Sequence, residues 1–205
     1  MATTESAQRS GEQARTKIIE VAFEHFARFG YRGSSLARIA AEAEISQSGL
    51  LHHFRTKQAL LQAVLATRDL RDMAITGIKV DELASMDFDA LLSFFEDVVR
   101  HNVTNRSMIR LAHLSAAEAD GPDHPAYEWA TGRQRFLRSL IETALERDVA
   151  AGVVRPDVDT RAMTGLVIAA MDGLEGQWLL DADLDPAASF SYFTAWLRAS
   201  IKPVD

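Results

Sequence analysis

Apolar residues recur every three or four positions over long stretches of this chain, a spacing that predicts helices almost throughout. Gly and Pro fall almost entirely between these stretches, where they end helices. No segment alternates apolar and polar residues as a strand would. We therefore predict an all-α chain with about nine helices. The first covers residues 12–29, and Gly30 caps it, because a residue without Cβ adopts the left-handed conformation easily.

Four of these helices are predicted within the first 80 residues. A short second helix, capped by Ser34 or Ser35, leads through a tight turn to a third short helix over 47–54, and Thr56 caps the fourth. Two short helices joined by a turn of about three residues are what reading a DNA major groove requires, since one helix crosses the backbone while the next inserts. An ordinary helical hairpin has the same outline, so geometry alone leaves both interpretations open.

The remainder predicts a separate helical body. Apolar rows over 88–103 and 108–119 precede a break at 121–125, whose two prolines cannot continue a helix. Three further helices are expected, over 126–151, from the region of Asp157 or Asp159 to 180, and from Pro186 onward.

The charge is divided unevenly along the chain. The formal net charge is -7, which by itself argues against a nucleic-acid binder. Residues 1–70, however, carry 9 Lys and Arg against 7 Asp and Glu, whereas the remainder carries 13 against 22. A mildly basic head on an acidic body orients the molecule towards phosphate. The chain has no cysteine, which excludes disulfide and thiol chemistry.

Neither a secretory signal nor a membrane span is predicted. Residues 1–11 are polar, lack an apolar run and are expected to form a disordered arm. The most apolar stretch, 163–180, is interrupted by Asp172 and Glu175, so it does not fit an ordinary membrane helix. We expect a cytoplasmic protein without a membrane partner.

One continuous stretch carries a family resemblance. Residues 18–65, IIEVAFEHFARFGYRGSSLARIAAEAEISQSGLLHHFRTKQALLQAVL, closely resemble the DNA-binding domain of the TetR family. The resemblance implies a helix-turn-helix DNA-binding domain over 12–56 and a helical ligand-binding and dimerisation domain over 57–205. It further implies a homodimeric transcriptional regulator, by the family's commoner mode a repressor, that binds a (pseudo)palindromic operator and responds to an unknown small-molecule effector.

The same resemblance assigns roles within the helix-turn-helix. Gln47, Ser48 and His52 fall at positions that face base edges, and their amide, hydroxyl and imidazole groups suit major-groove hydrogen bonding. The positions that look like phosphate contacts are Ser35, His53, Arg55 and Lys57. For His53, a neutral histidine in the core remains the alternative.

Leu51 departs from the family pattern, which commonly has a tyrosine there whose hydroxyl reaches the DNA backbone. Either other residues (His53, Arg55 and Lys57) take over this contact, or Leu51 packs inward and the helix is slightly rotated. Leu50 and Phe54, four residues apart, are assigned to the core.

A dimer face is predicted on the last two helices, which the resemblance places in a four-helix bundle with their copies. Gly165, Ala169 and Gly173 recur every four residues and leave one helix face nearly bare. A two-fold dimer is expected because one short helix reads too few bases. An intramolecular core explains the apolar residues of the last helix equally well. They are Phe190, Phe193, Trp196, Leu197 and Ile201.

The effector pocket is implied by the resemblance to lie among the middle helices. Asn102, His113 and Glu175 stand among apolar rows, where a polar side chain needs a partner, either a ligand or an internal hydrogen bond. The candidate lining residues are Phe95, Val99, Asn102, Met108, His113, Trp129, Phe136, Met171, Glu175 and Trp178.

Enzyme and scaffold functions are the alternatives. The sequence contains no Gly-rich phosphate loop, no G-x-S-x-G motif and no HExxH motif, so neither catalysis nor a cofactor is expected. His52 and His53 are adjacent and point about a hundred degrees apart on a helix, which is poor geometry for one metal ion. A helical scaffold protein is distinguished by the absence of salt-dependent, sequence-preferring DNA binding.

Overall fold

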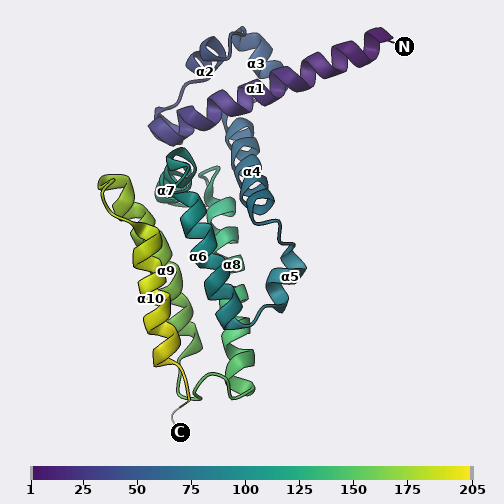
Figure 1. The fold of residues 1–205 in the computed structure, drawn as a ribbon. Coiled ribbons are helices and arrows are strands. Elements are labelled where there is room, and N and C mark those ends of the chain that lie inside the picture. Colours follow the sequence, from purple (N-terminus) through teal and green to yellow (C-terminus); the bar gives the residue numbers. More distant parts are fainter. Residues whose placement is uncertain (1, 204–205) are drawn as a thin grey trace. The chain divides into compact units, whose positions relative to one another are not determined.

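The computed structural model describes the backbone of residues 2–203 and the side chains of residues 10–71 and 77–203. This part of the chain forms ten helices and no strand (Figure 1), which confirms the all-α prediction. The helix that the sequence did not predict is the fifth, whose six residues are too few to show a period. The helices are α1 (Ala2–Gly33), α2 (Leu36–Glu42), α3 (Gln47–His53), α4 (Lys57–Thr76), α5 (Val80–Ser85), α6 (Phe88–Asn102), α7 (Arg106–Glu118), α8 (Tyr127–Ala150), α9 (Thr160–Leu180) and α10 (Pro186–Ser200).

The chain divides into two compact units. The first combines Met1–Asp72 with Arg110–Ala130, and the second combines Met73–Ile109 with Thr131–Asp205. This division differs from the boundary expected between residues 56 and 57, because most of α4 and the segment 110–130 belong with the head. The first unit is therefore built from two stretches that are distant in sequence.

Helix α1 is longer than predicted. It begins at Ala2, so residues 2–11, for which a disordered arm was expected, are helical, while Met1 lies outside the described residues. Half of these ten residues, namely Ala2, Glu5, Ala7, Gln8 and Arg9, have high helix propensity and none is proline, although Thr, Ser and Gly make up the other half. Near its other end, Gly30 has φ 68 and ψ 179, which interrupts the helix where the sequence predicted its cap.

The helix-turn-helix lies in the first unit, where α2 and α3 lie close to each other beside α1 (Figure 1). The turn between them places Glu44 at φ 58. Ser46 then caps α3, its Oγ accepting the Gly49 N–H at 3.0 Å. Buried apolar side chains of α1, including Ile18 and Phe26, form part of the core of this unit. One side of α3 stays outside this core, since Gln47, Ser48 and His52 are exposed.

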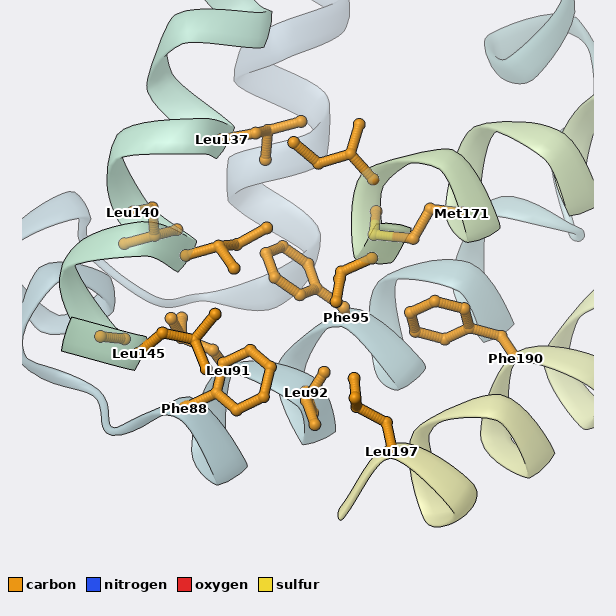
Figure 2. Close-up of a cluster of buried hydrophobic side chains, with 14 of the residues drawn as sticks. Phe88, Leu91, Leu92, Phe95, Leu137, Leu140, Leu145, Met171, Phe190 and Leu197 are labelled. Atoms are coloured by element: carbon orange, nitrogen blue, oxygen red, sulfur yellow. The ribbon is translucent and has the colours of Figure 1, made fainter. Parts of the chain in front are cut away.

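The second unit is a helical bundle of α6, α9, α10 and most of α8 (Figure 1). Aspartates cap three of its helices, as the sequence predicted for α9 and α10. Figure 2 shows side chains of all four helices meeting in one apolar cluster. The labelled members are Phe88, Leu91, Leu92, Phe95, Leu137, Leu140, Leu145, Met171, Phe190 and Leu197.

Polar contacts fix α10 against α6 in this bundle. The Arg198 guanidinium donates to Glu96 Oε1 at 2.6 Å and to Ser93 Oγ at 2.8 Å, and it also contacts the Asp89 carboxylate. The helix that carries Arg198 is thereby held in register with α6. None of the described helices combines the length and the apolar character that crossing a membrane requires.

Candidate nucleic-acid interface

Helix α3 has a polar outer face and an apolar inner face. Gln47, Ser48 and His52 are exposed, whereas Leu50 and Phe54 are buried. The two buried residues are four apart, as are Ser48 and His52, so each pair lies on one side of the helix. The assignment of Leu50 and Phe54 to the core is confirmed, and the three residues predicted to read bases share the accessible side.

Leu51 lies on the exposed side of the same helix. Its side chain is 37% exposed, which contradicts the alternative that it packs inward. His53 is half-buried, so it is neither a core histidine nor fully accessible. The His52 and His53 ring centroids are 5.7 Å apart with the rings nearly perpendicular. In the described part of the chain, no three side chains of the metal-ligating types are grouped to hold an ion.

Lys57 is engaged within the protein. Its ammonium donates to the Ser34 carbonyl at 2.8 Å and lies 4.5 Å from the centroid of the Tyr31 ring. Burial lowers the pKa of Lys57 from its ordinary value, and the negative charge of Glu118 partly opposes this shift. Lys57 therefore holds the turn before α2, which weakens its prediction as a direct phosphate contact.

Ser35 precedes α2 as its N-cap residue with φ -124. Its side chain makes no capping hydrogen bond to the helix and is half-buried. The hydroxyl is therefore not used by the helix that it precedes, which suits the predicted phosphate contact.

Three arginines near the helix-turn-helix are exposed: Arg15, Arg38 and Arg55. None of them forms an ion pair with any residue whose side chain the structure describes, whereas Lys17 pairs with Glu44 in the same unit. The Arg15 guanidinium stacks over the Phe54 ring at 5.1 Å, beside the end of α3. Arg15 and Arg38 were missed by the sequence analysis, although their place on the polar sides of amphipathic helices was a usable signal.

The ten candidate pocket residues are divided between the two compact units. His113 and Trp129 belong to the first unit, where the Trp129 indole N–H donates to Asp69 Oδ2 at 2.8 Å. Phe136 is 43% exposed on α8, which contradicts its assignment to an interior pocket. Trp178 is half-buried beneath the guanidinium of Arg106, 5.0 Å from its ring. The remaining six are buried in the second unit: Phe95, Val99, Asn102, Met108, Met171 and Glu175.

Two of these six are polar and bind each other. The Asn102 amide donates to Glu175 Oε1 at 2.7 Å, linking α6 to α9 inside the second unit. The sequence left either a ligand or an internal hydrogen bond as the partner of these polar residues, and the structure shows the internal hydrogen bond.

The predicted dimer residues fall into two groups. Phe190 and Leu197 have no exposed surface and belong to the core of the chain itself, so the structure contradicts their assignment to a dimer face. Phe193 is half-buried against the same core, and Ile201 is buried. Trp196, by contrast, is 61% exposed on α10.

The small residues of α9 face outward. Ala169 and Gly173 are exposed and Gly165 is half-buried, and a Cβ added at either glycine would meet no atom within 4 Å. Large exposed apolar side chains lie on the same two helices, namely Leu166 on α9 and Tyr192 with Trp196 on α10. We call the set Leu166, Ala169, Gly173, Tyr192 and Trp196 the α9–α10 face.

Comparison with known proteins identifies the helix-turn-helix segment as a TetR-type DNA-binding domain. The profile of the family described as "Bacterial regulatory proteins, tetR family" matches residues 18–64, which span α2 and α3. The chain is similar to the HTH-type transcriptional regulator UidR of Escherichia coli, with 23% identity over 195 residues, 95% of this chain and 94% of the other.

Solved structures resemble the whole fold. A TetR transcriptional regulator from Chloroflexus aurantiacus has a TM-score of 0.78 at 20% identity, covering 96% of this chain and 100% of the other. NalD, the secondary repressor of the MexAB-OprM multidrug efflux pump in Pseudomonas aeruginosa, has a TM-score of 0.76 at 22% identity, covering 95% and 98%. The related proteins are regulators rather than enzymes, in agreement with the sequence prediction. With a matching helix-turn-helix profile and this fold, the chain belongs to the TetR family of DNA-binding transcriptional regulators.

Proposed function

We propose that α3 enters the major groove of operator DNA with Gln47, Ser48 and His52 facing base edges. The observation that supports this most strongly is the polar outer side of α3, held accessible while Leu50 and Phe54 anchor the opposite side. Amide, hydroxyl and imidazole groups have the donors and acceptors that base edges require.

In this complex we expect exposed arginine side chains without an acidic partner to contact the phosphates of the DNA backbone. Arg15, Arg38 and Arg55 are exposed and lack an acidic partner within the described side chains, so their charges are available to phosphate. Ser35 adds a hydroxyl at the start of α2, and His53 remains a predicted contact. In this arrangement Lys57 contributes by holding the turn before α2 rather than by binding DNA.

Two substitutions separate base reading from phosphate binding. On a duplex selected from a random library, Gln47→Ala is expected to lose about 1–3 kcal/mol of discrimination at one base position, with little change on random DNA. Arg55→Ala is expected to weaken binding to selected and random duplexes alike, and to reduce the slope of log K against log salt by about 1.

Fluorescence anisotropy at several salt concentrations measures both effects. Arg100→Ala is the charge-matched control, because Arg100 lies in the second unit and already pairs with Asp97. Equal losses on selected and random DNA for both head variants contradict this division of roles.

We infer that the α9–α10 face joins two copies of the chain. Its exposed Leu166, Tyr192 and Trp196 lie on the same two helices as exposed small residues of α9, and no atom lies within 4 Å of a Cβ added at Gly173, so another helix pair is able to approach closely. A two-fold pair also presents two copies of α3, which reading two operator half-sites requires.

Trp196→Glu is expected to shift the equilibrium from dimer towards monomer. A charge placed among buried apolar groups, with loss of the indole, is expected to raise the dissociation constant about 100-fold or more. Light scattering coupled to size exclusion measures the mass. Val153→Glu, which makes the same kind of change at an exposed loop residue, is expected to stay dimeric. The mass is followed over a dilution series, because a tight dimer stays associated at micromolar concentration even after a 100-fold loss of affinity. A dissociation constant that is unchanged in Trp196→Glu contradicts this interface.

We infer that a small-molecule effector acts through the second unit and that the protein represses transcription. The candidate contact for the effector is the buried Asn102–Glu175 pair, which lies one helical turn from Val99 and Met171 in an apolar interior. A ligand that binds there has to replace the hydrogen bond between the two side chains. A ligand that binds one arrangement of the helices better than another shifts the population of DNA-binding molecules. Repression is supported by the similarity to NalD, which is described as a repressor. A cytoplasmic location is proposed as well, because operator DNA lies in the cytoplasm of a bacterial cell.

A further inference from the structure

The turn that leads from the break in α1 at Gly30 to the start of α2, residues 30–34, is held by a carboxylate from a distant part of the sequence. Glu118, the last residue of α7, accepts the Tyr31 N–H at Oε2 (2.6 Å) and the Arg32 N–H at Oε1 (3.3 Å). Two consecutive backbone amides therefore share one carboxylate. Hydrogen bonds to an ionised acceptor are roughly twice as strong as neutral ones.

A cation holds the carbonyl groups of the same turn. The Lys57 ammonium donates to the Ser34 carbonyl at 2.8 Å and, at 3.5 Å, to that of Arg32. The turn thus gives its N–H groups to an anion and its carbonyl groups to a cation. The segment that enters α2 is consequently fixed at several points of its backbone.

The niche that receives the carboxylate depends on a glycine. Gly30 has φ +68, and a Cβ built there would lie 2.5 Å from Glu118 Oε1 and 2.8 Å from its Cδ. Only a residue without a side chain leaves room for this approach. The position of the carboxylate is therefore supported by space as well as by hydrogen bonds.

The turn determines where the helix-turn-helix begins. Ser35, the N-cap of α2, follows it directly, and α2 packs on α3. Helix α7 is shared between the two units. Its first four residues, Arg106–Ile109, belong to the second unit, and Arg110–Glu118 belong to the first. Glu118 is thus the point at which this helix contacts the backbone that leads to α2.

We propose that Glu118 is a positioning residue for DNA binding, through which the end of α7 fixes the orientation of α2 and α3. This inference rests on the proposed function of α3. A head whose turn is fixed before binding has less conformational freedom to lose on DNA, so the clamp raises affinity without touching DNA. It also places a determinant of DNA binding outside residues 18–64, the stretch that matches the family profile.

Glu118→Gln tests the proposal, because the amide keeps one acceptor and replaces the other with a donor that faces a backbone N–H. Binding to the selected duplex is expected to weaken about tenfold, with the preference over random duplex falling in parallel. Asp120→Asn is the matched control. It removes the same charge two residues away, where the Asp120 carboxylate pairs only with the exposed side chain of Arg32, at 2.9 Å, among the described residues. The control is expected to change affinity less than about twofold.

Hydrogen exchange of the free protein provides a second readout. The Tyr31 and Arg32 amides are expected to exchange faster in Glu118→Gln than in the wild type and the control. Glu118→Asp keeps the charge but is too short to reach both amides, so it is expected to share the loss. It decides the matter if Glu118→Gln does not fold.

The outcomes separate the possible failures. Faster exchange with unchanged affinity, measured well below the unfolding temperature, means that the clamp only stabilises the fold and overturns the positioning role. Unchanged exchange at both amides overturns the clamp itself. Wild-type protein that selects no duplex contradicts the proposed function of α3 and, with it, any positioning role in DNA binding.

Discussion

Replacing Phe95 with alanine is expected to lower the free energy of unfolding by about 3–5 kcal/mol. Phe95 is almost completely buried, and Figure 2 shows it at the centre of the cluster that joins α6, α8, α9 and α10. Removing its ring deletes buried apolar surface and leaves a cavity that the surrounding helices fill only in part. Urea denaturation followed by circular dichroism measures the change.

Phe136→Ala is the matched control for this prediction. Its side chain is partly exposed on α8, and its truncation is expected to change stability by less than about 1 kcal/mol. Phe95 was also a candidate pocket residue, so the experiment bears on both roles. A Phe95→Ala loss as small as that of the control would show that the interior around Phe95 is not closely packed.

Replacing Gly30 with alanine is expected to lower the free energy of unfolding by about 3 kcal/mol. The backbone at φ 68 and ψ 179 lies in a region that essentially only glycine occupies, and it contributes about 1–3 kcal/mol of strain for a residue with a Cβ. Displacing the Glu118 carboxylate from two amides contributes the rest, since hydrogen bonds to charged groups contribute about 1.5–3 kcal/mol. Thermal or urea unfolding of the variant measures the sum.

A double-mutant cycle separates the two contributions. In Gly30→Ala combined with Glu118→Ala the clash is absent, so the combined loss is expected to be smaller than the sum of the single losses. Gly33→Ala is the control in the same segment, because its added Cβ meets only the Phe29 Cβ at 3.4 Å. Additive losses at residues 30 and 118 contradict a direct conflict between the new methyl group and the carboxylate.

The local signals in the sequence predicted most of the fold. Gly30 was expected to end the first helix and interrupts it there with a positive φ, three residues before α1 ends, and Asp185 with Pro186 opens α10 as expected. These features depend on neighbouring residues only, so they are readable without tertiary structure. The start of α1 at Ala2 shows the limit, because a polar segment forms a helix by propensity with no apolar face to reveal it.

The candidate site was predictable where one helix decides exposure. The spacing of four correctly placed Leu50 and Phe54 inside, and the family resemblance placed Gln47 and His52 at outward positions, where both are exposed. The assignment of Lys57 as a phosphate contact did not anticipate its bond to the Ser34 carbonyl, a contact that depends on how the turn folds. Roles in base reading stay predictions.

Contacts between distant segments were not predictable from the sequence. Phe190 and Trp196 have the same apolar character on α10, yet one is buried and the other exposed, because the bundle decides which side of the helix it covers. Glu118 gave no signal at all, since nothing in its own neighbourhood reveals that a turn 87 residues away needs an acceptor.

The first unit is built from two separate stretches of sequence, which has a consequence for building hybrid regulators. A hybrid made by exchanging N-terminal DNA-binding segments between related proteins assumes that this segment is a module that ends soon after the helix-turn-helix. Here the compact head also contains residues 110–130, and a graft of residues 1–72 alone would leave the Tyr31 and Arg32 amides without their carboxylate. A transplant that preserves DNA recognition therefore has to bring a glutamate at the matching place in the recipient, or carry the second stretch along with the first.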